Sequence, residues 1–207
     1  MYYLFDFDGT LIDSMPFWVN THVESLRSFG IAVPEDFVQI ITPIGNTRAC
    51  ALAVEMGVPM TFEAYFDRID EFLLDGYSNK IPAKPYAIET LRRLKAEGHS
   101  VNILSAGSHR YVDPCVRRLG LTELLDRVWT VEDFGCGKNE TIIYKMAAER
   151  LGVPMSECVF IDDNYVAVKT GVEAGMYTVA VYDPSSAPFR AEMQQIADRY
   201  IEDLSQL

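Results

Sequence analysis

Two aspartates, Asp6 and Asp8, stand directly after an apolar segment at the start of the chain. The segment YYLF, positions 2–5, contains residue types that favour strands. A charged pair at the end of a buried strand costs solvation free energy unless another group offsets it. Because side chains two positions apart in a strand point to the same side, both carboxylates are expected to face one cavity. Asp6 could then attack phosphorus as a nucleophile, and Asp8 could protonate the leaving alcohol and deprotonate the hydrolytic water.

Polar residues also follow three other predicted strands. Ser105 ends the second strand, Lys138 lies in the loop after the third, and Asp162-Asp163 ends the fourth. In open α/β sheets, ligands bind beyond the carboxyl ends of the strands. We therefore expect these side chains to converge with the first two aspartates on one edge of a sheet.

Carboxylates that converge in this way predict a bound cation. Two unit charges about 4 Å apart repel by roughly 4 kcal/mol at an effective dielectric constant of about 20. Oxygen ligands without His or Cys favour a hard ion, so we expect Mg²⁺. The expected ligands are the carboxylates of Asp6 and Asp163 and the main-chain carbonyl of Asp8, with Asp162 supporting Asp163 from outside the ligand set.

Other residues near this edge could bind a phosphorylated substrate. Ser105 and the amides of Ala106 and Gly107 could hold phosphoryl oxygens, and Thr10 offers a hydroxyl. Lys138 could offset the charge of the nucleophile and of the phosphoryl group.

One arginine could contact the leaving group. Arg48 ends the segment PIGNTR, positions 43–48, and could grip an anionic leaving group. A solvated arginine at a helix start is the alternative.

The elements that would position these residues alternate between strand and helix, which predicts a Rossmann-like parallel sheet covered on both faces. Strands are predicted at Tyr2–Phe7, Val101–Ser105, Val128–Val131, Cys158–Asp162 and Thr178–Tyr182, with a short edge strand at Tyr200–Leu204. Helices are predicted at Tyr86–Glu97, Arg110–Leu119, Thr141–Leu151, Tyr165–Ala174 and Arg190–Tyr200.

Residues 15–84 break this alternation. Three or four helical stretches follow one another there without a convincing strand, including Phe17–Phe29, Thr47–Met56 and a helix that Thr61 would cap. About 70 helical residues inserted after the first strand predict a second, smaller domain. The predicted domains are therefore a core of 1–14 with 85–207 and an all-helical insert of 15–84, of a four-helix type.

Composition limits the partners. The net charge of −12 at pH 7 should repel nucleic acid and anionic membranes, and it favours cation binding. Four scattered cysteines without C-x-x-C spacing predict reduced thiols, and no secretory signal or membrane span is evident. We expect a cytoplasmic protein, monomeric or a weak homodimer.

The motifs together resemble a known family. Positions 6–11, DFDGTL, resemble the first motif of the haloacid dehalogenase superfamily; Ser105 resembles the second, Lys138 the third and Asp162-Asp163 the fourth. The helical insert is similar to that superfamily's C1 cap, and the motifs are similar to those of phosphoglycolate phosphatase-like and β-phosphoglucomutase-like members. The resemblance implies a Rossmann-like core, Mg²⁺ dependence, phosphatase activity in most members, and a cap that closes over the substrate.

Some positions depart from the family pattern. Dehalogenase members generally lack the second aspartate of the first motif, whereas Asp8 is present here. Phosphomutase members usually carry a cap histidine where this chain has Trp18. Asn139 replaces a common proline, and Ala167 replaces an acid or Asn that would support the metal ligands.

The sequence therefore predicts a Mg²⁺-dependent phosphatase that hydrolyses a small phosphorylated metabolite through an aspartyl phosphate. Two alternatives stay open. One is a sugar phosphomutase that uses the same intermediate, and the other is a non-enzymatic protein with this fold.

Overall fold

The computed structural model describes residues 1–42 and 44–207, in which the chain forms two compact units. The first unit comprises Met1–Asp13 and Pro82–Leu207, and the second comprises Ser14–Ile81. The segment that interrupts the strand–helix alternation in the sequence thus forms a body of its own. Its function as a cap stays a prediction.

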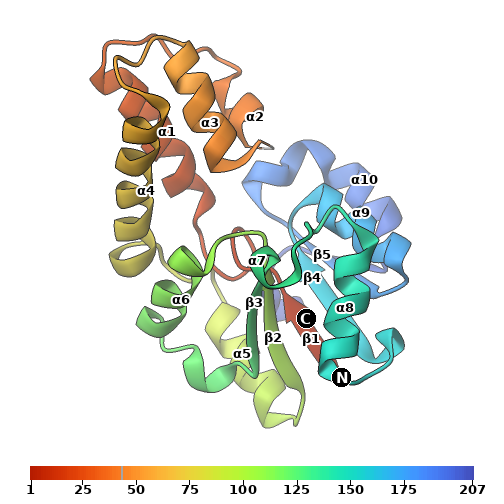
Figure 1. Cartoon of the computed structure of the whole chain (residues 1–207). Helices are drawn as coiled ribbons and strands as arrows, with labels where there is room; N and C mark the ends of the chain where they lie inside the picture. Colours follow the sequence, from red (N-terminus) through yellow and green to blue (C-terminus); the bar gives the residue numbers. More distant parts are fainter. Residues whose placement is uncertain (43) are drawn as a thin grey trace. The chain divides into compact units, whose positions relative to one another are not determined.

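The described part of the first unit contains a six-stranded sheet in which every pairing is parallel. The strands run in the order β3-β2-β1-β4-β5-β6 (Figure 1). Their bounds are β1 Tyr2–Phe5, β2 Ser100–Ser105, β3 Arg127–Thr130, β4 Cys158–Asp162, β5 Tyr177–Val181 and β6 Arg199–Ile201. The predicted α/β fold is confirmed. The strand order reverses between β1 and β4, and a reversal of this kind is where such sheets bind ligands.

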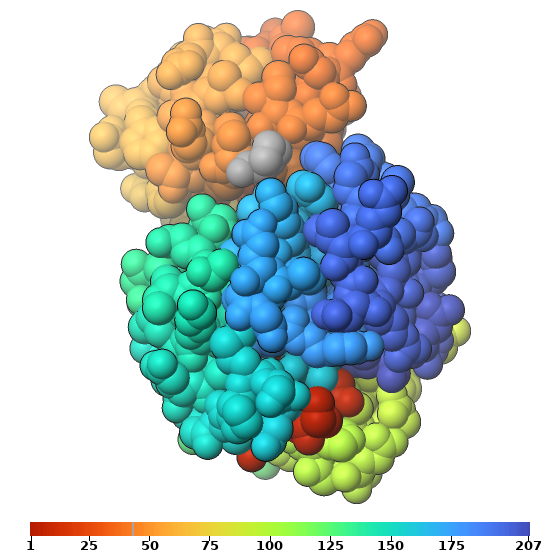
Figure 2. All heavy atoms as spheres, turned by 90° about the vertical axis from the view of Figure 1, so that its right-hand side faces the viewer, coloured from red at the N-terminus to blue at the C-terminus, as the bar shows by residue number. Residues whose placement is uncertain are grey.

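Helices cover both faces of this sheet. Figure 1 shows α5 and α6 on one face and α8, α9 and α10 on the other. The helices are α5 Ala87–Ala96, α6 His109–Arg118, α7 Val131–Phe134, α8 Thr141–Leu151, α9 Tyr165–Ala174 and α10 Arg190–Ile196, with 3₁₀ turns at Thr122–Leu124, Met155–Glu157, Pro184–Phe189 and Leu204–Gln206. In Figure 2, α8, α9 and the C-terminal segment form most of this side of the first unit, and part of the N-terminal segment (red) stays visible.

The core beneath this layer holds the strand ends in place. Tyr144 of α8 packs edge-on against Phe160 of β4, with ring centroids 4.9 Å apart, and both side chains are fully buried. Leu4 of β1, which adjoins β4, and Leu104 of β2, one strand further, belong to the same buried cluster. Each such side chain contributes about 1.5–3 kcal/mol by its burial.

The second unit is helical in its described part. It contains α1 Met15–Ser28, α2 Phe37–Ile41, α3 Gly45–Glu55 and α4 Phe62–Asn79. Thr61 caps α4 as predicted, because its hydroxyl accepts a hydrogen bond from the Ala64 amide at 3.3 Å. Gly76 of α4 lets α1 approach closely, since a Cβ there would lie 2.1 Å from the ring of Phe17.

Several predicted element ends are wrong, and two of them have a clear physical reason. The strand expected through Phe7 ends at Phe5, because the chain turns and the Phe7 carbonyl accepts the amides of Leu11 and Ile12, each at 3.0 Å. The helix expected through Tyr200 ends at Ile196, because Arg199–Ile201 pairs with β5 as the edge strand β6. In residues 1–42 and 44–207, no helix combines the length and apolar character that crossing a bilayer requires.

Candidate active site

Three aspartates meet at the carboxyl ends of β1 and β4. A carboxylate oxygen of each of Asp6, Asp162 and Asp163 lies within 4.8 Å of the others. Their exposed fractions are 4%, 0% and 4%. At this separation, each ionised pair repels by about 3.5 kcal/mol at an effective dielectric constant of about 20. The sheet therefore concentrates negative charge where water screens it poorly.

A buried lysine offsets part of this charge. The Lys138 ammonium donates to Oδ1 of Asp6 and, at 2.7 Å, to Oδ2 of Asp162. Burial alone would lower the pKa of Lys138, but the charges of Asp162 and Asp6 outweigh it and raise that pKa. Lys138 therefore stays charged. Three ionised carboxylates and one ammonium carry a formal charge of −2.

Burial and the neighbouring carboxylates raise the pKa values of two of these aspartates. Burial raises the pKa of Asp162 to about 7, although Lys138 opposes the shift. Burial also raises the pKa of Asp163 well above its usual range, and the neighbouring Asp6 and Asp162 raise it further. A divalent cation would remove this penalty, because it would balance the formal charge of the cluster.

The turn after β1 supports Asp163 directly. The Thr10 hydroxyl is fully buried and donates to Oδ1 of Asp163 at 3.0 Å. Gly9 adopts φ +87°, and a Cβ there would lie 2.5 Å from Oδ2 of Asp163. Only glycine fits this turn without moving the carboxylate. The structure thus assigns Thr10 a contact with a carboxylate, and its predicted contact with substrate stays a prediction.

Lys84 is a residue of this site that sequence reasoning missed. Its ammonium donates to the Gly9 carbonyl at 2.7 Å and to Oδ2 of Asp183 at 2.6 Å. Lys84 thereby ties the turn after β1 to the loop after β5. The position of Asp183 just past a predicted strand was the only sequence signal for this contact.

Asp8 and Ser105 approach each other at the end of β2. A Cβ placed on Gly107 would lie 3.1 Å from Oγ of Ser105 and 3.3 Å from Oδ2 of Asp8. The Gly107 amide donates to Ser105 Oγ at 2.9 Å, and its expected contact with a phosphoryl oxygen stays a prediction. Ala106 is exposed in the same loop. The structure therefore brings Asp8 and the Ser105 loop together, as expected.

One predicted residue belongs to the other unit. Arg48 is exposed on α3, and its contact with a leaving group stays a prediction. Pro43, the first residue of the segment PIGNTR, lies outside the described residues.

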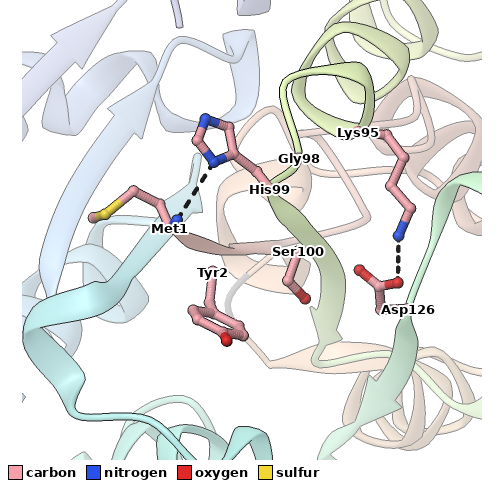
Figure 3. A pocket seen from close by; sticks show the side chains of 7 residues that line it. All are labelled: Met1, Tyr2, Lys95, Gly98, His99, Ser100 and Asp126. Atoms are coloured by element: carbon pink, nitrogen blue, oxygen red, sulfur yellow. Dashed lines mark hydrogen bonds and ion pairs between the residues drawn. The ribbon is translucent and has the colours of Figure 1, made fainter.

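A hollow of about 450 Å³ lies at the opposite end of the sheet, where β1 and β2 begin (Figure 3). It is lined by Met1, Tyr2, Lys95, Gly98, His99, Ser100 and Asp126. Lys95 forms an ion pair with Asp126 there, and the Met1 amino group lies 3.4 Å from Nδ1 of His99. Since this lysine and this carboxylate neutralise each other, the hollow differs from the acidic cluster, where negative charge is in excess.

The acidic cluster fits a hard divalent metal ion. Its three side chains offer oxygen ligands only, and they already lie close enough to share one ion. The tight turn at Gly9 and the hydrogen bond from Thr10 fix the orientation of Asp163. We therefore assign the cluster as the candidate metal centre.

The chain is similar to several known proteins. A family model described as "haloacid dehalogenase-like hydrolase" matches residues 2–175. Hexitol phosphatase A of Escherichia coli (strain K12) is 30% identical over 192 residues, which are 90% of this chain and 85% of that protein. (S)-2-haloacid dehalogenase 1 of a Pseudomonas species is 31% identical over 132 residues, 61% of this chain and 58% of that protein.

A solved structure extends the likeness to the whole fold. The putative β-phosphoglucomutase from Thermotoga maritima superposes with a TM-score of 0.82 at 21% identity, covering 100% of this chain and 96% of that one. The matched family model, the parallel sheet and the acidic cluster agree: the chain belongs to the haloacid dehalogenase-like hydrolases.

Proposed function

We propose that this hydrolase is a Mg²⁺-dependent phosphatase that acts on a small phosphorylated metabolite through an aspartyl phosphate. The observation that supports the proposal most strongly is the buried group of Asp6, Asp162 and Asp163, whose negative charge exceeds what the Lys138 ammonium can balance. Asp8 beside Ser105 supports phosphoryl chemistry over carbon–halogen cleavage, because hydrolysis through this intermediate needs an acid and base next to the nucleophile.

In this proposal, Asp6 is the nucleophile. One of its oxygens would attack phosphorus while Lys138, which contacts the same carboxylate, offsets the charge that accumulates on the phosphoryl oxygens. Asp8 would give its proton to the leaving alcohol and then take one from the water that hydrolyses the aspartyl phosphate. Ser105 would hold a phosphoryl oxygen, and Ala106 and Gly107 would contribute amides once the loop adjusts.

Asp6 and Asp163, with the Asp8 carbonyl, would hold Mg²⁺, and Asp162 would orient Lys138 beside them. When bound, the ion supplies positive charge that neutralises phosphoryl oxygens and lowers the repulsion between the anionic substrate and the aspartates. The Thr10 hydroxyl holds Asp163 in the orientation that this role needs.

The substrate class follows from charge and from the relatives. A phosphate monoester suits a cluster that binds one cation, and the similarity to hexitol phosphatase A makes hexitol phosphates the first compounds to test. Arg48 would contact an anionic leaving group. We further propose that the protein works in the cytoplasm as a monomer or weak homodimer and binds neither nucleic acid nor membrane, given its charge of −12.

The product into which the oxygen of the hydrolytic water is incorporated tests the proposal. Purified protein is first screened against hexitol phosphates, hexose phosphates, phosphoglycolate and nucleotides, with and without Mg²⁺. A single turnover of the best substrate in H₂¹⁸O should place the label in inorganic phosphate and none in Asp6, because water attacks phosphorus. Label in the Asp6 carboxylate would mean that water attacks the carboxyl carbon of an ester formed on Asp6, as in carbon–halogen cleavage. That result would contradict the proposal.

Variants make the test specific. Asp6→Asn and Asp8→Asn should each lower kcat by at least about 100-fold. Asp13→Asn is the matched control, because Asp13 lies a few residues further along and is exposed. Return of an isomeric sugar phosphate would favour the phosphomutase alternative. Equal turnover by Asp6→Asn and wild type would favour the non-enzymatic one.

A further inference from the structure

His109 lies with both ring nitrogens against carboxylates, outside the acidic cluster. Nδ1 is 3.0 Å from Oδ1 of Asp113, one turn further along α6, and Nε2 is 2.8 Å from Oδ2 of Asp133 in α7. The side chain of His109 is 33% exposed, as is that of Asp133. The ring therefore bridges two helices at the margin of the proposed active site.

The two bridged helices adjoin the two loops that would flank the phosphoryl group. His109 is the first residue of α6, directly after the loop that carries Ser105. Asp133 belongs to the short α7, from which the chain runs to Lys138. A second contact reinforces the bridge, because the His109 amide donates to Oε2 of Glu132 at 3.3 Å.

Asp133 is itself held in place. The same oxygen, Oδ2, accepts the Thr130 amide at 2.8 Å in the capping box of α7. Arg150 donates to the Asp133 carbonyl at 2.7 Å. His109 therefore attaches α6 to a fixed point on α7.

Both ring contacts require a protonated ring. A neutral imidazole has one N–H and one lone pair, so one of its nitrogens would face a carboxylate lone pair without a hydrogen. The imidazolium donates from both nitrogens. The hydrogen bond to Asp113 raises the pKa of His109, and Asp133 raises it further, against the opposing effect of partial burial.

We propose that the His109 imidazolium is a positioning residue that holds the Ser105 loop against the Lys138 loop, and that its deprotonation releases this bridge. The consequence for catalysis rests on the proposed phosphatase function. Above the pKa of His109, one of the two ring contacts is lost and the Ser105 loop loosens. Phosphoryl transfer should then fall, because small displacements of positioned groups cost rate.

Two carboxylates face the ring, those of Asp113 and Asp133. Glu132 accepts the backbone amide of His109, and Arg150 lies beside Asp133. Although burial opposes the shift, the Thr130 amide and His109 lower the pKa of Asp133, so this carboxylate stays ionised near neutral pH. Lys138 stays charged as well, since its neighbours raise its pKa. The ring of His109 is therefore the group at this bridge whose charge should change as pH rises past the usual histidine value of about 6.5.

Nuclear magnetic resonance titration of the full chain tests the bridge without any substrate. The ring resonances of His109 should titrate above the usual value of about 6.5, and Asp133→Asn should lower that midpoint. Amide resonances of Gly107 and Lys138 should shift with the same midpoint, and His109→Gln should abolish that shift. His99→Gln is the matched control, because His99 lies at the opposite end of the sheet (Figure 3). A His109 midpoint at or below about 6.5 would overturn the proposal. So would amide resonances of Gly107 and Lys138 that do not shift at the His109 midpoint.

A pH profile then tests the consequence for activity. In wild type, kcat should fall roughly tenfold with the midpoint seen for His109. His109→Gln should start at the reduced rate and lack this fall, with KM changing less than kcat. A His109→Gln profile that still falls at the wild-type midpoint would overturn the positioning role. A wild-type protein inactive on every phosphate ester would instead refute the proposed function, and the titration would still decide the bridge.

Discussion

Neutralising one aspartate should stabilise the metal-free protein while removing its metal site. Asp163→Asn keeps the shape of the side chain and an oxygen that can accept the Thr10 hydroxyl. It removes a charge that lies within 4.8 Å of Asp6 and Asp162. Each of these pairs costs about 3.5 kcal/mol when ionised, and Lys138, which contacts both neighbours, offsets roughly half of the total. At a pH above the native pKa of Asp163, where this carboxyl is ionised in wild type, the free energy of unfolding should therefore rise by roughly 3 kcal/mol.

The free energy of unfolding of the metal-free protein should also depend on pH through Asp163. The native Asp163 carboxyl binds its proton more tightly than the unfolded one, because its pKa is raised. Wild type in EDTA should therefore lose stability as pH rises from about 4 through the native pKa of this group, and Asp163→Asn should lose less.

Chemical denaturation in EDTA and in Mg²⁺ measures both effects. Mg²⁺ should stabilise wild type, because it binds the native state alone, and should leave Asp163→Asn unchanged. Asp13→Asn, at an exposed position, serves as the control in both conditions. If Asp163→Asn is no more stable than wild type in EDTA, repulsion among the buried carboxylates does not lower the free energy of unfolding, and the reasoning is refuted.

Three further perturbations follow from the same contacts and from one buried histidine. Lys138→Met should lower the unfolding free energy in EDTA by about 3–5 kcal/mol and kcat by at least about 100-fold, as measured by denaturation and turnover, because the buried carboxylates lose their counter-charge. Gly9→Ala should weaken Mg²⁺ binding in calorimetry, since its Cβ would meet the Asp163 carboxylate, whereas Gly30→Ala, at φ +73° with nothing within 4 Å, should cost only about 1–2 kcal/mol of stability. Burial lowers the pKa of His22 to about 4, so the free energy of unfolding should fall by about 3 kcal/mol between pH 6.5 and 4. In His22→Leu, the free energy of unfolding measured by denaturation should change less over this pH range.

Much of the fold was predictable because local signals agreed with tertiary structure. The helices α8 and α9 begin and end where the sequence predicts, each followed by a glycine in the left-handed region, Gly152 and Gly175. Asn164 caps α9 by accepting the amides of its first turn. The end of α10 was not predictable, since pairing with β5 overrides helical spacing there.

The sequence predicts which residues form the candidate site, but it does not predict which hydrogen bonds and ion pairs they form. Strand ends place Asp6, Asp163 and Lys138 at one edge, since parallel strands share their carboxyl ends. The sequence does not indicate that the Gly107 amide bonds to Ser105, because a short loop has several conformations. Contacts that join distant loops, such as Lys84 with its partner past β5, depend on packing that no local pattern encodes.

The central claim is that the buried aspartates share one divalent cation. Crystals of the wild-type protein grown with Mn²⁺, an ion that Mg²⁺ sites accept and that scatters anomalously, test it most directly. We predict one anomalous peak within coordination distance of carboxylate oxygens of Asp6 and Asp163, and none in crystals of Asp163→Asn. A peak elsewhere in the chain, or an Mn²⁺-saturated protein without density between these two carboxylates, would contradict the claim.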